Sequence, residues 1–335
     1  MGNNTGGNKM VKETGRSYGG RFSFAGRLSR CLENGFKKGI ASAVWLLTIM
    51  APVSLIVTII SYSGLLKHFG RLISPFFRIA GLPGEAALPF LTGAFINIYA
   101  GIAAMGTMAL NPRQVTILAL MMLFSHNLPV EVHVQRKAGM SALGVLSLRL
   151  SMSLLAALAL NYLLPAHPGV PVAVTGGTAV QGAFTEIMET WAKSLFILMG
   201  RVSAILVLLM FLQSILAEFN LMRPLSVILR PLLRAMGLPG KTAFLWIVAN
   251  TLGLAYGATV ILEEIESGVL DPQEVEILNR SIALCHSLLE DTLLFVAVGA
   301  FAPWITLPRV AVAAAAAWIY RFSRFLRGLS GISRA

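Results

Sequence analysis

Apolar stretches of membrane-crossing length alternate with short polar segments along this chain. The segment from Gly39 to Ser61 reads GIASAVWLLTIMAPVSLIVTIIS. A helix of about 20 apolar residues crosses a hydrocarbon core of about 30 Å, and this segment is long enough to do so. Further apolar stretches cover 85–109, 114–125 and 139–164, and Pro or Gly interrupts some of them. The pattern predicts an all-α, polytopic membrane protein.

The sequence also contains an internal repeat. GLPG occurs at Gly81–Gly84 and again at Gly237–Gly240, an offset of 156 residues. After a four-residue insertion near 265–268 the offset becomes 160 residues. The second offset pairs SHNL at 125–128 with CHSL at 285–288, Glu131 with Asp291, and Arg149 with Arg309. Such a collinear series indicates that one helical unit has been duplicated.

The repeat divides the chain into five parts. Residues 36–165 and 190–320 are expected to form the two membrane copies, and residues 166–189 are expected to link them outside the cytoplasm. Residues 1–35 are predicted to be a basic flexible cytoplasmic tail, and residues 321–335 a second basic cytoplasmic tail.

Composition and charge support a membrane protein rather than a nucleic-acid-binding protein. Hydrophobic residues make up 56% of the 335 residues and charged residues only 13%, whereas an average soluble domain has about 25% charged residues. The net charge of +12 is concentrated at the two ends, and no Lys or Arg occurs between Arg149 and Lys193. Lys and Arg accumulate on cytoplasmic flanks, so we expect both termini in the cytoplasm and the 166–190 loop outside.

This charge distribution predicts that the two copies have inverted topology. Each copy would then cross the membrane an odd number of times, although each has four apolar stretches. At least one stretch per copy is therefore expected to be re-entrant or broken, as in many secondary transporters. A parallel duplication in which every stretch crosses is the alternative.

Two basic segments are predicted to be amphipathic helices in the membrane interface. The segments 65–80 and 221–236 place basic residues at near-helical spacing among apolar ones. These residues are Lys67, Arg71, Arg78, Arg223, Arg230 and Arg234.

Ionisable residues recur in register within the apolar stretches. His126 and Glu131 correspond to His286 and Asp291, and Glu290 precedes Asp291. A charged side chain deep in a bilayer costs at least about 2.5–3.5 kcal/mol, so such residues need a partner, a wet cavity or a function. Imidazole and carboxylate together could bind a divalent transition metal, accept a coupling proton, or hydrogen-bond a sugar or base. A structural role is the alternative.

The local sequence suggests different backbones at the two histidines. Pro129 predicts a helix break close to His126. Copy two has no such proline, so His286 and Glu290 are expected to share one helix face.

Arg149 and Arg309 lie within apolar stretches and have two interpretations. Each guanidinium neutralises a carboxylate such as Glu131 or Asp291, or the pair lines a site for an anionic group such as phosphate. The stretches after each GLPG add Asn97 and Asn250 among small residues that allow close helix contact or local unwinding.

GLPGEAALPFLTGAFINIYAGIAA from Gly81, followed by SHNLPVE from Ser125, resembles the Gate domain shared by ferrous-iron transporters of the FeoB type and concentrative nucleoside transporters. Spore maturation membrane proteins are similar too, and CHSLLEDTLLF from Cys285 most resembles the nucleoside-recognition group. The resemblance implies a helical transporter fold in the inner membrane of a bacterium or archaeon. The iron transporters have a Cys where this chain has Ile96, and the chain has no GTP-binding loop, so iron transport by their mechanism is not implied.

We therefore expect a transporter-like protein that binds or moves a nucleoside-like compound or an ion at a midplane site between the copies. An accessory membrane module that works with a partner protein is the alternative. An enzyme is not expected, because no nucleophile and base occur at recognisable spacing, and no cofactor is expected. The expected partners are the lipid bilayer, the solute, and a second copy or another membrane protein, but not nucleic acid.

The predicted substrate-binding residues come from both copies. They are His126, Asn127, Glu131, His286, Ser287, Glu290, Asp291, Asn97, Asn250, Arg149 and Arg309. Should the solute be a metal, the ligands are expected among His126, His286, Glu131 and Asp291.

Overall fold

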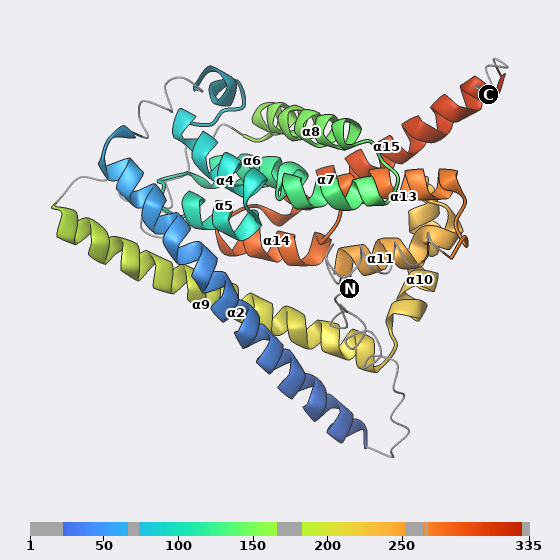
Figure 1. The fold of residues 1–335 in the computed structure, drawn as a ribbon, viewed down its shortest axis with the longest axis horizontal. Coiled ribbons are helices and arrows are strands. Elements are labelled where there is room, and N and C mark those ends of the chain that lie inside the picture. Colours follow the sequence, from blue (N-terminus) through green and yellow to red (C-terminus); the bar gives the residue numbers. More distant parts are fainter. Residues whose placement is uncertain (1–22, 66–73, 166–182, 252–263, 265–266, 330–335) are drawn as a thin grey trace, which may run out of the picture.

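A computed structural model of the chain describes residues 23–65, 74–165, 183–251, 264 and 267–329. All regular secondary structure in these ranges is helical (Figure 1). The helices of the first copy are α2 (Phe24–Tyr62), η1 (Gly84–Ala86), α4 (Ala87–Phe95), α5 (Ile98–Met105), α6 (Pro112–Ser125), α7 (Leu128–Lys137) and α8 (Ala142–Leu163). Those of the second copy are α9 (Phe184–Glu218), α10 (Met222–Ala235), η2 (Gly240–Thr242), α11 (Ala243–Thr251), α13 (Pro272–Leu284), α14 (Leu288–Ala297) and α15 (Ala302–Leu329).

Long apolar helices confirm the prediction of an all-α membrane protein. Five helical segments in the described ranges are long and apolar enough to cross a bilayer. They are α2, α8, α9, most of α15, and α6 together with α7.

The two longest helices, α2 and α9, pack against each other in opposite directions. The Arg27 guanidinium contacts the Glu218 carboxylate at 2.9 Å near one end of the pair. The Trp191 indole N–H donates to Ser54 Oγ at 3.1 Å toward the other end. Since low residue numbers in α2 meet high numbers in α9, the helices are antiparallel.

Small residues allow this close approach. A Cβ atom added at Gly39 would lie 2.6 Å from the Val207 Cα, so only glycine fits between these backbones. The helix that carries Gly39 begins at Phe24, which lies inside the segment 1–35 that was expected to be a flexible tail. The Ser23 side chain caps it by accepting the N–H of Gly26, and packing against α9 holds its first turns.

Each GLPG segment forms the same helix stop. Gly81 and Gly237 have φ of 72° and 84°, in the left-handed region that glycine adopts without strain. The N–H of the following Leu82 or Leu238 donates back to the carbonyl five residues earlier, which caps the preceding helix end. The motif that reveals the repeat is therefore structural.

Two predicted segments lie partly outside the described residues. In the first basic segment, residues 66–73 with Lys67 and Arg71 lie outside them, and residues 74–79 are helical. Its counterpart is helix α10, which carries Arg223, Arg230 and Arg234. Of the predicted linker 166–189, residues 166–182 lie outside the description, and α9 already begins at Phe184.

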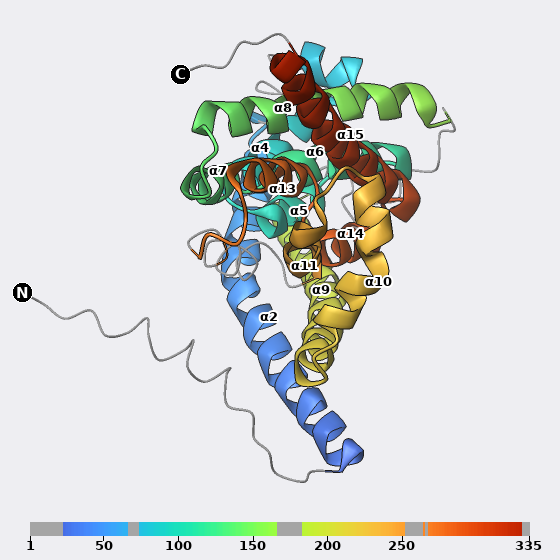
Figure 2. The ribbon, with the colours of Figure 1, turned by 90° about the vertical axis from the view of Figure 1, so that its right-hand side faces the viewer.

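The short helices lie between two pairs of long ones. Both views show α2 with α9 on one side of the molecule and α8 with α15 on the other (Figures 1 and 2). Between them lie α4 to α7 and α11, α13 and α14. The predicted histidines and carboxylates of the site lie in this central layer, whereas Arg149 and Arg309 belong to α8 and α15.

Candidate functional site

A helix break positions His126 in the first copy. Helix α6 ends at Ser125, and the next helix, α7, begins at Leu128. Asn127 between them adopts the left-handed region with φ of 51°, and its N–H donates to the Gly93 carbonyl of α4 at 2.9 Å. Pro129 follows in the first turn of α7, where a proline needs no N–H partner. The predicted break near His126 is confirmed.

The second copy repeats this break without a proline. Helix α13 ends at Leu284, Ser287 has φ of 47°, and α14 begins at Leu288. The Ser287 N–H donates to the Ala249 carbonyl of α11 at 3.1 Å, which matches the bond from Asn127. The prediction that His286 and Glu290 share a helix face is therefore wrong. His286 lies in the break, and only Glu290 belongs to α14.

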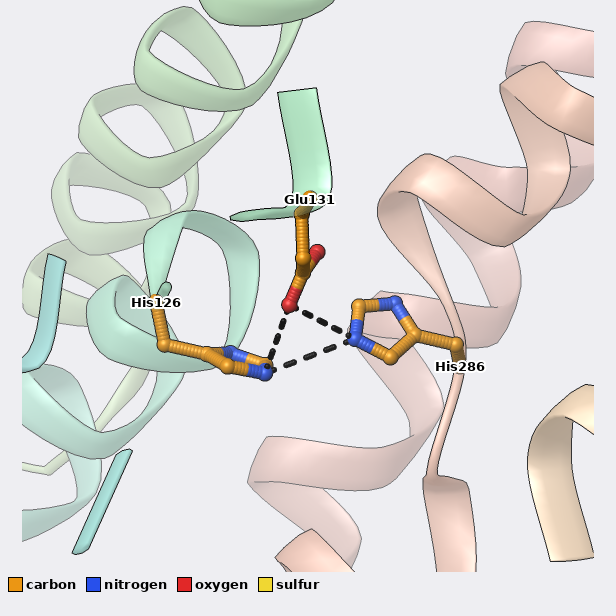
Figure 3. Close-up of side chains that lie close together, drawn as sticks. All are labelled: His126, Glu131 and His286. Carbon is orange, nitrogen blue, oxygen red and sulfur yellow. Dashed lines mark hydrogen bonds and ion pairs between the residues drawn. The ribbon is translucent and has the colours of Figure 1, made fainter. Parts of the chain in front are cut away.

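The two breaks bring His126 and His286 together. Their Nε2 atoms are 3.4 Å apart (Figure 3). Both residues are almost completely buried. Each Nδ1 atom faces a backbone carbonyl one helical turn earlier, that of Met122 at 3.1 Å or Ile282 at 2.8 Å. Since a carbonyl only accepts, each Nδ1 carries a proton. In its neutral form each ring therefore turns the lone pair of its Nε2 toward the other histidine.

Glu131 completes this group. Its Oε1 lies 3.1 Å from Nε2 of His126 and 3.2 Å from Nε2 of His286 (Figure 3). Two imidazole lone pairs and a carboxylate oxygen therefore converge on one point between the copies. We call His126, Glu131 and His286 the acceptor triad.

Buried arginines bind the broken backbones and the carboxylates. Arg149 of α8 donates from Nε to the Phe124 carbonyl at 2.8 Å and from Nη2 to the His126 carbonyl at 3.1 Å. Its Nη1 contacts Oε2 of Glu131. The carbonyls at the end of α6 thus gain a donor that replaces their missing helical partners.

The equivalent arginine of the second copy is bound less completely. Arg309 of α15 donates from Nη2 to the His286 carbonyl, and this atom lies 3.5 Å from Oδ2 of Asp291. Its Nε and Nη1 make no hydrogen bond within the described part of the chain, and neither does Oδ2 of Asp291. The contacts of Arg149 with Glu131 and of Arg309 with Asp291 are those that carboxylate neutralisation predicts.

The remaining predicted residues divide into supports and neighbours of the triad. Oδ2 of Asp291 is 3.9 Å from Nε2 of His126. The Asn250 amide donates to the Cys285 carbonyl at 3.3 Å, next to His286. Asn97 caps α5 by accepting the N–H of Ala100 at 2.8 Å. No contact in the described ranges brings Asn97 to the triad.

Tyr99 is the neighbour that the predicted set omits. Its hydroxyl donates to Oε1 of Glu290 at 2.5 Å and so connects α5 of the first copy to α14 of the second. The signal in the sequence was a tyrosine within the small-residue stretch after GLPG, two residues beyond Asn97. The position of Tyr99 in the sequence does not predict Glu290 as its hydrogen-bond partner.

Comparisons with known proteins identify relatives of this chain. The family model for the Gate domain, described as nucleoside recognition, matches residues 43–130, which include His126 and its helix break. The uncharacterized membrane protein YvoD of Bacillus subtilis (strain 168) is 30% identical over 271 residues, covering 79% of this chain and 86% of the relative. The chain belongs to the Gate family. No solved structure matches it significantly.

Family membership assigns a general role to this Gate protein. It is a membrane protein of a transporter-related family, and the resemblance stated from the sequence is confirmed. In this Gate protein, ionisable groups from both copies meet at the acceptor triad.

Proposed function

We propose that this protein transports a small polar solute across the membrane and binds it at the acceptor triad between the two copies. The observation that carries the proposal is the pair of helix breaks that bring His126 and His286 to within 3.4 Å between their Nε2 atoms. In many secondary transporters the solute binds where broken helices of the two repeats meet near the centre of the membrane.

An inverted relationship between the two copies would support the proposal that the protein is a transporter. Helices α2 and α9 begin the two copies and are antiparallel, as the contacts of Arg27 with Glu218 and of Ser54 with Trp191 require. An axis along the membrane normal would relate parallel helices, whereas an axis in the membrane plane relates antiparallel ones. The antiparallel pair therefore favours inversion. The basic flanks at both ends favour a cytoplasmic position for both termini.

Burial of the triad implies alternating access. His126, Glu131 and His286 are each at most 6% exposed, so a solute reaches them only when the packing around the breaks opens. Rocking of one copy against the other would open the site first to one side and then to the other. The protein would move its solute without changing it chemically.

The triad restricts the chemistry of the solute. Its three converging atoms are all acceptors when the histidines are neutral, so the bound group is a cation or a hydrogen-bond donor. A metal ion meets this requirement, and so do the hydroxyl or amino groups of a nucleoside, the solute class that the Gate family description names.

Uptake into proteoliposomes tests transport. The full chain is reconstituted and assayed with uridine, adenosine, Zn²⁺ and Co²⁺, beside the variants His126→Ala and His286→Ala. We expect uptake of at least one solute and a loss of at least about tenfold in both variants, because mutation of even an outer partner of a metal ligand costs about 10–100-fold. The matched control is His133→Ala, because His133 lies exposed on α7 and outside the triad.

Absence of uptake for the whole panel, together with stable co-purification of another membrane protein, would contradict transport by this chain alone. It would favour an accessory module instead. Uptake that is equal in wild type and His126→Ala would contradict the location of the site.

A further inference from the structure

We infer that the acceptor triad is a binding site for a divalent transition-metal ion, held by Nε2 of His126, Nε2 of His286 and Oε1 of Glu131. The inference deepens the proposed function and rests on it for the role of the ion as transported solute. Binding itself is a separate property and is measured without transport.

The spacing of the three atoms is the first argument. The three pairwise distances are 3.1, 3.2 and 3.4 Å. In a tetrahedral site with metal–ligand bonds of about 2.0–2.1 Å, the ligand atoms are about 3.3 Å apart. The triad thus has the dimensions of one face of a coordination tetrahedron, and all three ligand atoms lie within 4.8 Å of one another.

The orientation of the rings is the second argument. A metal-binding histidine nearly always donates its other ring N–H to a carbonyl or carboxylate, which fixes the ring and the tautomer. Both histidines do so, through Met122 and Ile282. Glu131 is fixed in the same way, because Arg149 holds Oε2 while Oε1 faces the histidines.

Electrostatics is the third argument. Two imidazole lone pairs and a carboxylate oxygen repel one another at these distances, and burial strengthens the repulsion. A cation between them converts the repulsion into attraction. Two imidazoles and one carboxylate form a donor set that suits Zn²⁺, Fe²⁺, Co²⁺ and Ni²⁺, whereas Mg²⁺ and Ca²⁺ prefer oxygen ligands only.

The surroundings predict an open and reversible site. Oδ2 of Asp291 is 3.9 Å from Nε2 of His126, beyond the edge of such a tetrahedron, so the fourth position is left to water. Arg149 and Arg309 already offset the charges of Glu131 and Asp291. Glu131 would therefore be the one anionic ligand that the triad offers, whereas structural zinc sites commonly hold several thiolates. Weaker binding suits an ion that must also leave.

Cobalt spectroscopy tests the site. The purified full chain in detergent is titrated with Co²⁺, whose tetrahedral complexes absorb visible light strongly, and Zn²⁺ is then added in competition. We expect one Co²⁺ per chain, displaced by Zn²⁺. His126→Ala, His286→Ala and Glu131→Gln should each lose at least about 100-fold in affinity, since loss of an outer partner alone costs about 10–100-fold.

Exposed residues of the same types provide the controls. His133 on α7 and Glu186 in the first turn of α9 are both exposed, so His133→Ala and Glu186→Gln should bind Co²⁺ like the wild type. The melting temperature of every variant is measured without metal. Zn²⁺ should raise the melting temperature of the wild type but not that of a folded triad variant.

The wild type alone can overturn the inference. If the wild-type protein binds neither Co²⁺ nor Zn²⁺, the metal site is contradicted. The triad would then bind a proton or a hydrogen-bond donor instead. Uptake of uridine or adenosine by a protein that binds no metal would contradict the metal site and support the proposed transport. Metal binding by a protein that takes up no solute would support the metal site and contradict the proposed transport.

Discussion

The hydroxyl of Tyr99 donates to Oε1 of Glu290 at 2.5 Å, and this hydrogen bond joins α5 of the first copy to α14 of the second. Glu290 precedes Asp291 in the first turn after the break at Ser287. The bond therefore helps to fix the second break against the first copy.

Removing this hydroxyl should destabilise the contact between the copies. A hydrogen bond to a charged group contributes about 1.5–3 kcal/mol, and Tyr99→Phe would leave the Glu290 carboxylate without this donor. We expect a lower melting temperature for Tyr99→Phe in detergent. Tyr162→Phe is the control, because Tyr162 is 90% exposed and should leave the melting temperature unchanged. Equal effects of the two variants would show that the bond does not contribute.

The two buried arginines should differ in their contribution to folding. Arg149→Met removes two hydrogen bonds to the broken backbone and leaves the Glu131 carboxylate buried without its guanidinium. Removing one partner of a buried ion pair costs about 3–5 kcal/mol. Arg309→Met loses one backbone hydrogen bond and a looser contact with Asp291, so its effect should be smaller.

Yield of monodisperse protein and melting temperature check this order. Arg136→Met serves as the control, because Arg136 is exposed at the end of α7. A larger loss in Arg309→Met than in Arg149→Met would contradict the asymmetry between the two breaks.

The repeat predicted that His126 and His286 meet, because an offset of 160 residues aligns them, as it aligns Glu131 with Asp291. It could not predict the second break. Copy two has Leu289 where copy one has Pro129, and a local sequence without proline favours a continuous helix. The break there depends on tertiary contacts, namely the bond from Ser287 to Ala249 and that from Arg309 to the His286 carbonyl.

The start of the first helix was missed for a similar reason. Residues 24–35 are basic and only partly apolar, which locally resembles a flexible tail. Helix α9 stabilises them as a helix through the contacts of Arg27 with Glu218. The local sequence around Arg27 does not predict its contact with Glu218, and the local sequence around Glu218 does not predict it either.

Close packing of α4 against α5 should be required for the geometry of the first break. A Cβ atom at Gly101 would lie 2.9 Å from the Cα of Gly93, so Gly101→Ala forces the two helices apart. The Gly93 carbonyl accepts the N–H of Asn127, so the displacement would reach His126. We expect Gly101→Ala to lower both the melting temperature and the affinity for Co²⁺.

Gly200 in α9 provides the matched substitution. A Cβ atom at Gly200 has no neighbour within 4 Å, and Ala is favoured over Gly in a helix by about 0.5–1 kcal/mol. Gly200→Ala should therefore keep or raise the melting temperature. If Gly101→Ala changed neither the melting temperature nor the affinity for Co²⁺, α4 and α5 would adjust to the added methyl group without moving the break.

Inverted topology predicts that equivalent positions of the two copies face opposite sides of the membrane. Ser141 and Phe301 directly precede α8 and α15, correspond through the offset of 160 residues, and are both exposed. Each is replaced by Cys in a chain in which the buried Cys31 and Cys285 are Ser. A membrane-impermeant maleimide applied to whole cells should label Phe301→Cys and should label Ser141→Cys only after permeabilisation. Labelling of both from the same side would mean that the duplication is parallel, and the triad would then need another route of access.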